Sequence, residues 1–281
     1  PMNHATFDRL FEANVPSLFP LTAARSMYEP LHPLKFAFNL SYQDQVRGAI
    51  RYMVDKEGFQ KVCVQAPATD YGAESVEGYE AIVEELGLES VYAGRHKGSE
   101  TDFVGTATSI KNSGCELLFL GSFIKDTILL YTAVRDTGWE GTVVTNMVPY
   151  LPEIPAAADG GMNGMYAVAP FYVPDFSIVE PDTWVGRWQA SYEERFGIEP
   201  AAQAVIGYLC ADLTVIALER AGPDLTVVKL IEGLESISTY QDPFGNLELS
   251  LGPAKHVATN YLNLYQVQDQ RWLTVAENVE F

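Results

Sequence analysis

Four aromatic residues recur at positions where side chains could hold a small organic molecule: Tyr42, Tyr71, Phe123 and Tyr150. Aromatic rings offer a large contact area, and tyrosine hydroxyls add directional hydrogen bonds. Any one of these rings taken alone would indicate packing in a core. Several rings that converge on one opening favour a binding site for a small organic ligand, and the chemistry available to them is noncovalent.

The sequence contains no motif for making or breaking covalent bonds. It lacks a GxSxG elbow, a P-loop, a GxGxxG fingerprint, an HExxH motif and paired carboxylates. The histidines are dispersed along the chain: His4, His32, His96 and His256. Asp70 and Asp126 could act as site acids, but an aspartate in the first turn of a helix is more often a partner of the helix dipole. We therefore expect no catalytic residue and no enzymatic activity.

Cys63, Cys115 and Cys210 lie in apolar strand or helix patterns, without CxxC spacing or a nearby pair of histidines. Metal and redox roles need such spacing. We interpret the three cysteines as small core residues, and we expect neither a bound metal nor a cofactor.

Composition excludes several classes of partner. Among 281 residues, 18 Lys and Arg face 37 Asp and Glu, a net charge of -19, and the acids are scattered rather than in a block. Nucleic acids and anionic membrane surfaces are poor partners for such a charge. With 47% hydrophobic residues and no apolar run of membrane-spanning length, we expect a soluble globular chain. The first six residues do not resemble a signal peptide, so we expect that segment to be absent from this chain.

Helix and strand patterns alternate from residue 36 onward. Four strand-helix units predict a parallel sheet covered by helices on both faces, which is an α/β fold. The expected strands are 61–65, 90–93, 116–120 and 142–145, and the expected helices are 41–57, 71–87, 101–113 and 122–138. In such sheets the ligand crevice lies beyond the carboxyl ends of the strands, here at 67–71, 121–123 and 146–150.

The rhythm changes after residue 150. Segments rich in Pro and Gly, 151–164 and 170–174, flank a short strand at 165–169 and suggest a hinge. Three helices are expected at 182–196, 201–221 and 225–234, followed by β-strands at 247–250, 261–267 and 272–275.

Several short segments together resemble one known family, the type I periplasmic binding proteins of the branched-chain amino acid (leucine, isoleucine and valine) class. Their order and spacing carry the likeness over the whole chain: 16–24, 38–45, 70–72, 101–103, 120–123, 195–200 and 207–212. The resemblance implies two flavodoxin-like α/β lobes that close on a solute. It assigns 1–37 plus 173–258 to an N-terminal lobe and 38–172 plus 259–281 to a C-terminal lobe. The family's first lobe begins with further βα units, so this lobe is expected to be incomplete and the chain N-terminally truncated.

The resemblance also implies ligand contacts. Leu21, Thr22, Ala23 and Ala24 match a loop that binds the solute's carboxylate through backbone N–H groups and a hydroxyl at a helix start. Tyr71 and Phe123 match aromatic residues of the second lobe. Where the amino acid binders place acids that hold the ligand's ammonium, this chain has Tyr42 and Asn146 or Met147. A carboxylate or amide with an aromatic or apolar body therefore fits better than a zwitterionic amino acid.

These observations predict a periplasmic solute receptor that delivers a small molecule to the permease of an ABC importer and acts as a monomer. Two other classes stay open. The same fold serves as the ligand domain of amide-responsive regulators, and an enzyme could be built on a flavodoxin-like sheet.

Overall fold

The computed structural model describes residues 3–245 and 247–281. The chain divides into two compact units. Unit 1 comprises Pro1–Ser41 and Pro170–Asn260, and unit 2 comprises Tyr42–Ala169 and Tyr261–Phe281. Each unit is therefore built from two separate stretches of chain.

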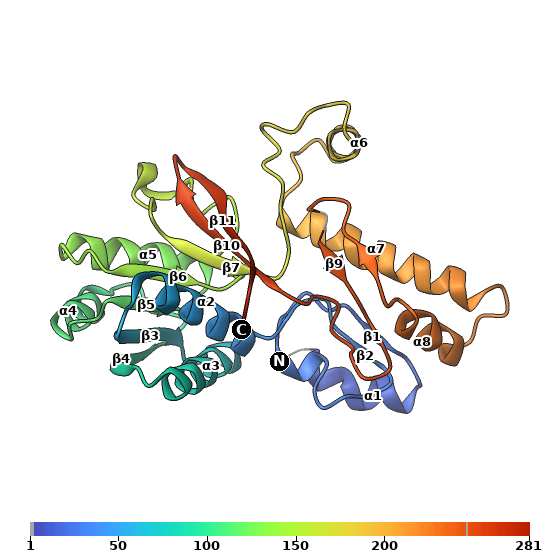
Figure 1. The fold of residues 1–281 in the computed structure, drawn as a ribbon, viewed down its shortest axis with the longest axis horizontal. Coiled ribbons are helices and arrows are strands. Elements are labelled where there is room, and N and C mark those ends of the chain that lie inside the picture. The colour runs from blue at the N-terminus through green and yellow to red at the C-terminus, as the bar shows by residue number, and fades with distance from the viewer. Residues whose placement is uncertain (1–2, 246) are drawn as a thin grey trace. The chain divides into compact units, whose positions relative to one another are not determined.

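A seven-stranded sheet organises unit 2, in the order β11-β10-β7-β6-β5-β3-β4 (Figure 1). Five neighbouring strands are parallel: β3 (Lys61–Pro67), β4 (Glu89–His96), β5 (Leu117–Leu120), β6 (Thr142–Thr145) and β7 (Tyr166–Ala169). β10 (Leu262–Gln268) pairs antiparallel with β7, and β11 (Arg271–Val279) pairs antiparallel with β10. The predicted α/β class is confirmed.

Helices cover this sheet because its central strands are apolar on both faces. Every residue of β5 is buried, as is typical of a parallel strand between two helical layers. α2 (Tyr42–Glu57) packs beside α3 (Asp70–Leu86), and α4 (Val104–Asn112) packs beside α5 (Ile124–Asp136). The α4 and α5 side contributes Ala107, Ile110, Leu130 and Val134 to a buried core with Leu118 and Val143 of the sheet.

The strand order creates a switch point. β3 lies between β4 and β5 in the sheet. The chain therefore passes from β3 to β4 on one side of β3 and then crosses back to β5 on the other side. In open α/β sheets ligands bind beyond the carboxyl ends of the strands at such a point. In this chain those ends lead into the starts of α3 and α5.

A disulfide joins Cys63 of β3 to Cys115, which precedes β5, with the two Cα atoms 6.0 Å apart. Both cysteines are buried core residues, as predicted, but the disulfide between them was not predicted. Cys210 is a free, half-buried thiol, and burial raises its pKa to about 12, which leaves it protonated and unreactive at neutral pH. The bridge spans 52 positions of sequence, so spacing alone did not reveal it.

Unit 1 is mostly helical in its described part. It contains η1 (His4–Thr6), α1 (Phe7–Glu12), η2 (Arg25–Met27), α6 (Trp184–Phe196), α7 (Ala202–Ala221) and α8 (Val227–Glu235). β1 (Ser17–Leu18) and β2 (Lys35–Phe36) form a parallel pair, and Ala37 bridges Val257. β8 (Tyr240–Gln241) pairs antiparallel with β9 (Glu248–Leu249). The segment 151–164 belongs to unit 2 and contains only the short η3 (Ala157–Gly160).

Among the described helices, α7 alone is long and apolar enough to cross a membrane. Core helices of soluble proteins meet the same criteria. Leu209, Leu213 and Ala217 of α7 are buried, and its Asp212 carboxylate accepts a hydrogen bond of 2.7 Å from the Tyr240 hydroxyl. These contacts make α7 a packed helix of unit 1.

Asp242 gives unit 1 an unusual dependence on pH. Its carboxyl is 2% exposed, and burial raises its pKa to about 6, although the Phe244 N–H donates to Oδ1 at 2.7 Å. The folded state therefore holds this proton more tightly than the unfolded state does, and its contribution to stability falls as pH rises from about 4 to about 6.

We expect Asp242→Asn to remove that fall, since the amide oxygen keeps the bond to Phe244 while the side chain stays neutral. At pH 7 the variant should be more stable than the parent by roughly 3 kcal/mol, from about 1.4 kcal/mol per pKa unit. Urea unfolding at pH 4 and pH 7 measures this. Parallel pH profiles of the two proteins would show that Asp242 is not the group responsible.

Candidate functional site

The carboxyl ends of β3, β5 and β6 bring rings and neutral polar groups together on one wall of unit 2. We call this the switch-point wall and define it by Tyr42, Tyr71, Ser122, Phe123 and Asn146. Tyr42 is the first residue of α2, Tyr71 is the second of α3, and Phe123 is the N-cap of α5. Ser122 and Asn146 directly follow β5 and β6 in their loops.

The start of α3 explains where Tyr71 lies. The Thr69 hydroxyl caps the helix by accepting from the Gly72 N–H at 3.2 Å. A Cβ on Gly72 would come within 2.0 Å of the Pro67 carbonyl oxygen. Only glycine lets the helix begin this close to the end of β3, and the tyrosine is thereby held at the sheet edge.

Three rings of the wall touch in series. The Tyr71 ring meets Tyr42 edge-on, with centroids 4.6 Å apart, and meets Phe123 at a tilt, with centroids 5.2 Å apart. Tyr42 is buried, whereas Phe123 is 43% exposed. The structure thus brings together three of the four aromatic residues singled out above, in an arrangement that offers ring surface to an apolar body.

The ring contacts of Tyr150 are with the C-terminal hairpin of unit 2. Its ring is 4% exposed and stacks on Tyr265 of β10, with centroids 4.2 Å apart and 24° between the planes. Trp272 of β11 meets it edge-on. Packing against the C-terminal hairpin holds this ring, and a place for Tyr150 in the crevice stays a prediction.

Asn146 supplies the wall with a hydrogen-bond donor. Its Oδ1 accepts from the Tyr71 hydroxyl and from the Val148 N–H, each at 3.0 Å, and the latter bond fixes which amide atom is the oxygen. Its Nδ2 is buried and has no partner among the described residues. Such a donor costs about 1–3 kcal/mol until an acceptor reaches it.

Two hydroxyls around the start of α5 also lack a hydrogen-bond partner among the described residues. Ser122 Oγ and Thr127 Oγ1 are buried without a partner in the described part of the chain. The Ser122 carbonyl lies 3.4 Å from the Tyr71 hydroxyl, so this serine and Asn146 are both neighbours of one phenol. Buried polar atoms without partners are rare in native proteins, so each of these groups is a candidate to bind water or a ligand.

The loop after β6 is held from α2. The Met147 N–H donates to Gln45 Oε1 at 3.0 Å, and Met147 itself is 9% exposed. Gln45 was not among the predicted site residues. It lies one turn after Tyr42 on the same helix, so α2 positions both a ring and the loop of the wall.

The wall carries no charge of its own. Burial raises the pKa of Tyr71 well above its ordinary value, while the hydrogen bond to Asn146 opposes the shift, so the phenol stays a neutral donor. Asp70 lies exposed at the start of α3. Asp126 is buried and lies 3.3 Å from His96 Nε2. Neither acid belongs to the switch-point wall.

The four remaining predicted residues, Leu21 to Ala24, belong to unit 1. Leu21 is exposed and Ala23 is buried, while the Thr22 hydroxyl accepts from the Ala24 N–H at 3.3 Å. The helix that follows is the single 3-10 turn η2. Asn39 Nδ2 donates to the Leu21 carbonyl at 3.1 Å, which ties this loop to the segment after β2.

Comparison with known proteins decides the family. A family model described as periplasmic binding protein matches residues 5–271. The chain belongs to the periplasmic binding protein family. A search of curated proteins gave no match.

Solved structures share the fold of this binding protein. A branched-chain amino acid ABC transporter protein from Thermus thermophilus, with bound valine, has a TM-score of 0.86 at 18% identity, covering 99% of this chain and 76% of that one. A solute binding protein of an ABC transporter from R. palustris, in complex with benzoate, has a TM-score of 0.81 at 17% identity, covering 99% and 75%. A fatty acid ABC transporter substrate-binding protein from Thermomonospora curvata has a TM-score of 0.81 at 18% identity, covering 99% and 72%.

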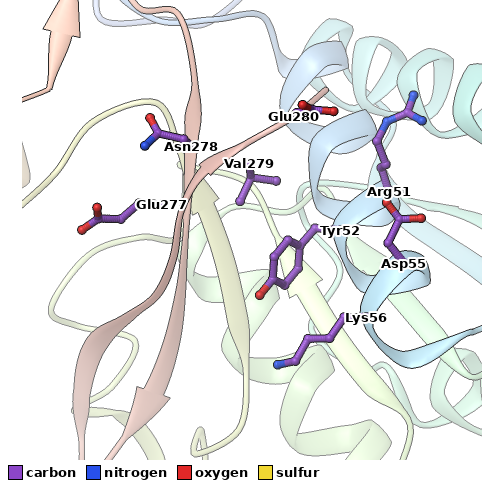
Figure 2. Close-up of a pocket in the computed structure, with 8 residues that line it drawn as sticks. All are labelled: Arg51, Tyr52, Asp55, Lys56, Glu277, Asn278, Val279 and Glu280. Carbon is purple, nitrogen blue, oxygen red and sulfur yellow. The ribbon is translucent and has the colours of Figure 1, made fainter.

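Two hollows of the binding protein lie away from the predicted residues. One of about 380 Å³ lies between α2 and the end of β11, lined by Arg51, Tyr52, Asp55, Lys56 and residues 277–280. Figure 2 shows Tyr52 pointing from α2 toward the strand. Arg51 bonds to Glu85 at 2.6 Å, and the charges on this lining are mixed. The other, of about 410 Å³ in unit 1, includes Phe11, His32 and Lys35.

Proposed function

We propose that this protein is an extracytoplasmic solute receptor of an ABC importer, and that its ligand is a small carboxylate or amide with an aromatic or apolar body. The observation that carries the proposal is the switch-point wall: three rings in series beside a buried amide donor without a partner. In the proposed complex the ligand contacts the switch-point wall. We propose that the loop Leu21–Ala24 of unit 1 also binds the ligand, through backbone N–H groups and the Thr22 hydroxyl.

The donors define which end of the ligand meets the wall. Asn146 Nδ2 and the Ser122 hydroxyl can each donate a hydrogen bond, and a carbonyl or carboxylate oxygen accepts both. The Tyr71 hydroxyl donates to Oδ1 of Asn146, so this bond leaves Nδ2 available to the ligand. The apolar body of the ligand then lies against Phe123, the most exposed ring of the wall.

The neutral wall disfavours an amino acid. An ammonium group taken out of water without a counter-charge costs several kcal/mol. The valine-bound and benzoate-bound structures show that this fold accepts either kind of solute. Of the two, a benzoate-like acid fits a wall of rings and amides without a carboxylate.

Two further features support the setting. Disulfides persist in oxidising compartments, and the Cys63–Cys115 bridge fits a location outside the cytoplasm. The described strands β1 and β2 of unit 1 form only a two-stranded sheet, and α7 exposes Val215 and Leu218. Both observations fit a lobe that further βα units complete. A monomer that docks on a permease is the proposed working form.

A thermal-shift panel tests the proposal with benzoate, octanoate, benzamide and valine as probes. A ligand that binds only the folded state raises the free energy of unfolding by about 2.7 kcal/mol at a concentration 100 times its Kd. We expect benzoate or benzamide to raise the melting temperature and valine to have the smallest effect. A panel without any shift, or with valine as the strongest ligand, contradicts the proposal.

A further inference from the structure

A chain of buried hydrogen bonds lies behind the switch-point wall. The Tyr92 hydroxyl donates to Gln65 Oε1 at 2.9 Å, and Gln65 Nε2 lies 3.0 Å from His96 Nδ1. His96 Nε2 lies 3.3 Å from Asp126 Oδ2. Gln65, His96 and Asp126 are 1%, 6% and 3% exposed. This chain crosses β4, β3 and the first turn of α5.

The chemistry of the four groups gives the chain one direction. An amide nitrogen only donates, so His96 Nδ1 accepts from Gln65, and the imidazole proton is on Nε2. That proton points to a carboxylate, which only accepts. Each residue is therefore satisfied by the next, and Asp126 is the end of the chain.

His96 also contacts an aromatic ring. The edge of its ring packs on Phe103, the N-cap of α4, with centroids 5.2 Å apart. The helix α5, which carries Asp126, also carries Phe123 at its N-cap, where the Phe123 carbonyl accepts from the Thr127 N–H at 2.8 Å. Through its hydrogen bonds to Gln65 and Asp126, His96 links β3 and β4 to the first turn of α5, and Phe123 lies at the start of that helix.

Phe123 needs this support because burial does not hold it. Its ring is 43% exposed and touches Tyr71 at 5.2 Å between centroids. The position of a half-exposed ring therefore depends mainly on the backbone to which it is attached. Within the described part of the chain, His96 is the hydrogen-bond partner of the Asp126 side chain, so one link fixes the start of α5 to the sheet.

We propose that Asp126 and His96 are positioning residues for the ligand: their hydrogen bond holds the first turn of α5 so that Phe123 stays over Tyr71. The expected effect on ligand affinity rests on the proposed function. The position of the ring itself does not depend on which ligand binds.

The first test needs no ligand. Phe123 is replaced by 4-fluorophenylalanine, and the 19F resonance is recorded in the parent, D126A, D126N and H96A backgrounds. We expect D126A and H96A to move the resonance toward its value in the urea-unfolded protein. D126N should keep the parent value, because its amide oxygen still accepts from His96. An unchanged resonance in both D126A and H96A overturns the proposal, and two different variants guard against misfolding of either one.

The second test is a double-mutant cycle with benzoate as the probe. D126A should weaken benzoate binding roughly tenfold in the parent and less than about twofold in F123A, since the effect passes through the ring. The melting temperature should fall equally in both backgrounds. An equal loss of affinity in both backgrounds shows that Asp126 acts elsewhere and overturns the proposal. If the parent does not bind benzoate, the proposed ligand is wrong, and the fluorine experiment still decides the positioning role.

Discussion

Reducing the disulfide between Cys63 and Cys115 is expected to lower the free energy of unfolding by about 4 kcal/mol, the chain-entropy value for a closed loop of 52 residues. The bridge joins β3 to the residue that leads into β5, so it restrains the unfolded chain across two helices and one strand. For a chain of this size the melting temperature should fall by roughly 10 °C.

Urea unfolding of the oxidised protein, the reduced protein and C63A/C115A measures this effect. C210A is the matched control, because Cys210 is a half-buried thiol outside the bridge. We expect it to change stability by less than about 1 kcal/mol. If oxidised and reduced protein unfold at the same urea concentration, the bridge does not restrain the chain as described.

Asn146→Asp is expected to weaken benzoate binding by about 100-fold or more. An aspartate oxygen can still accept from Tyr71 and from the Val148 N–H, as Oδ1 of the parent does. The change therefore replaces only the unpartnered donor with an acceptor that carries negative charge. Loss of a charge-assisted hydrogen bond and repulsion between two carboxylates together cost about 3 kcal/mol.

Calorimetric titration of parent and N146D with benzoate measures the loss, and a parallel titration with valine tests for a gain with an ammonium ligand. Circular dichroism should be unchanged, because both acceptor contacts of residue 146 are kept. Equal affinity for benzoate in the two proteins would mean that Asn146 does not meet the ligand.

The sequence was sufficient for the α/β class because the pattern is local. β5 is apolar at every position, and the helices on either side of it show their own spacing. The same local logic placed Tyr71 and Phe123 directly after strands. What the pattern lacks is the order of strands: that β3 lies between β4 and β5 follows from packing, and so does the pairing of Cys63 with Cys115.

Features of the site that the pattern missed have a similar cause. The stacking of Tyr150 on Tyr265 could not be predicted, because Tyr265 comes from a strand far along the sequence. β4 continues to His96, beyond the expected end at residue 93, so the last residue of this strand is a histidine that lies behind the wall. Only the three-dimensional arrangement shows that Asn146 Nδ2 lacks a partner, since a single residue type does not reveal its contacts.

We propose that a carbonyl or carboxylate oxygen of the ligand binds at the wall beside Tyr71 and Asn146. NMR of the side-chain amide of Asn146, assigned with N146D, during a titration with benzoate observes this contact. We expect this amide resonance and the ring resonances of Tyr71 and Phe123 to shift together and saturate. Saturable binding that leaves the Asn146 amide unchanged would contradict it.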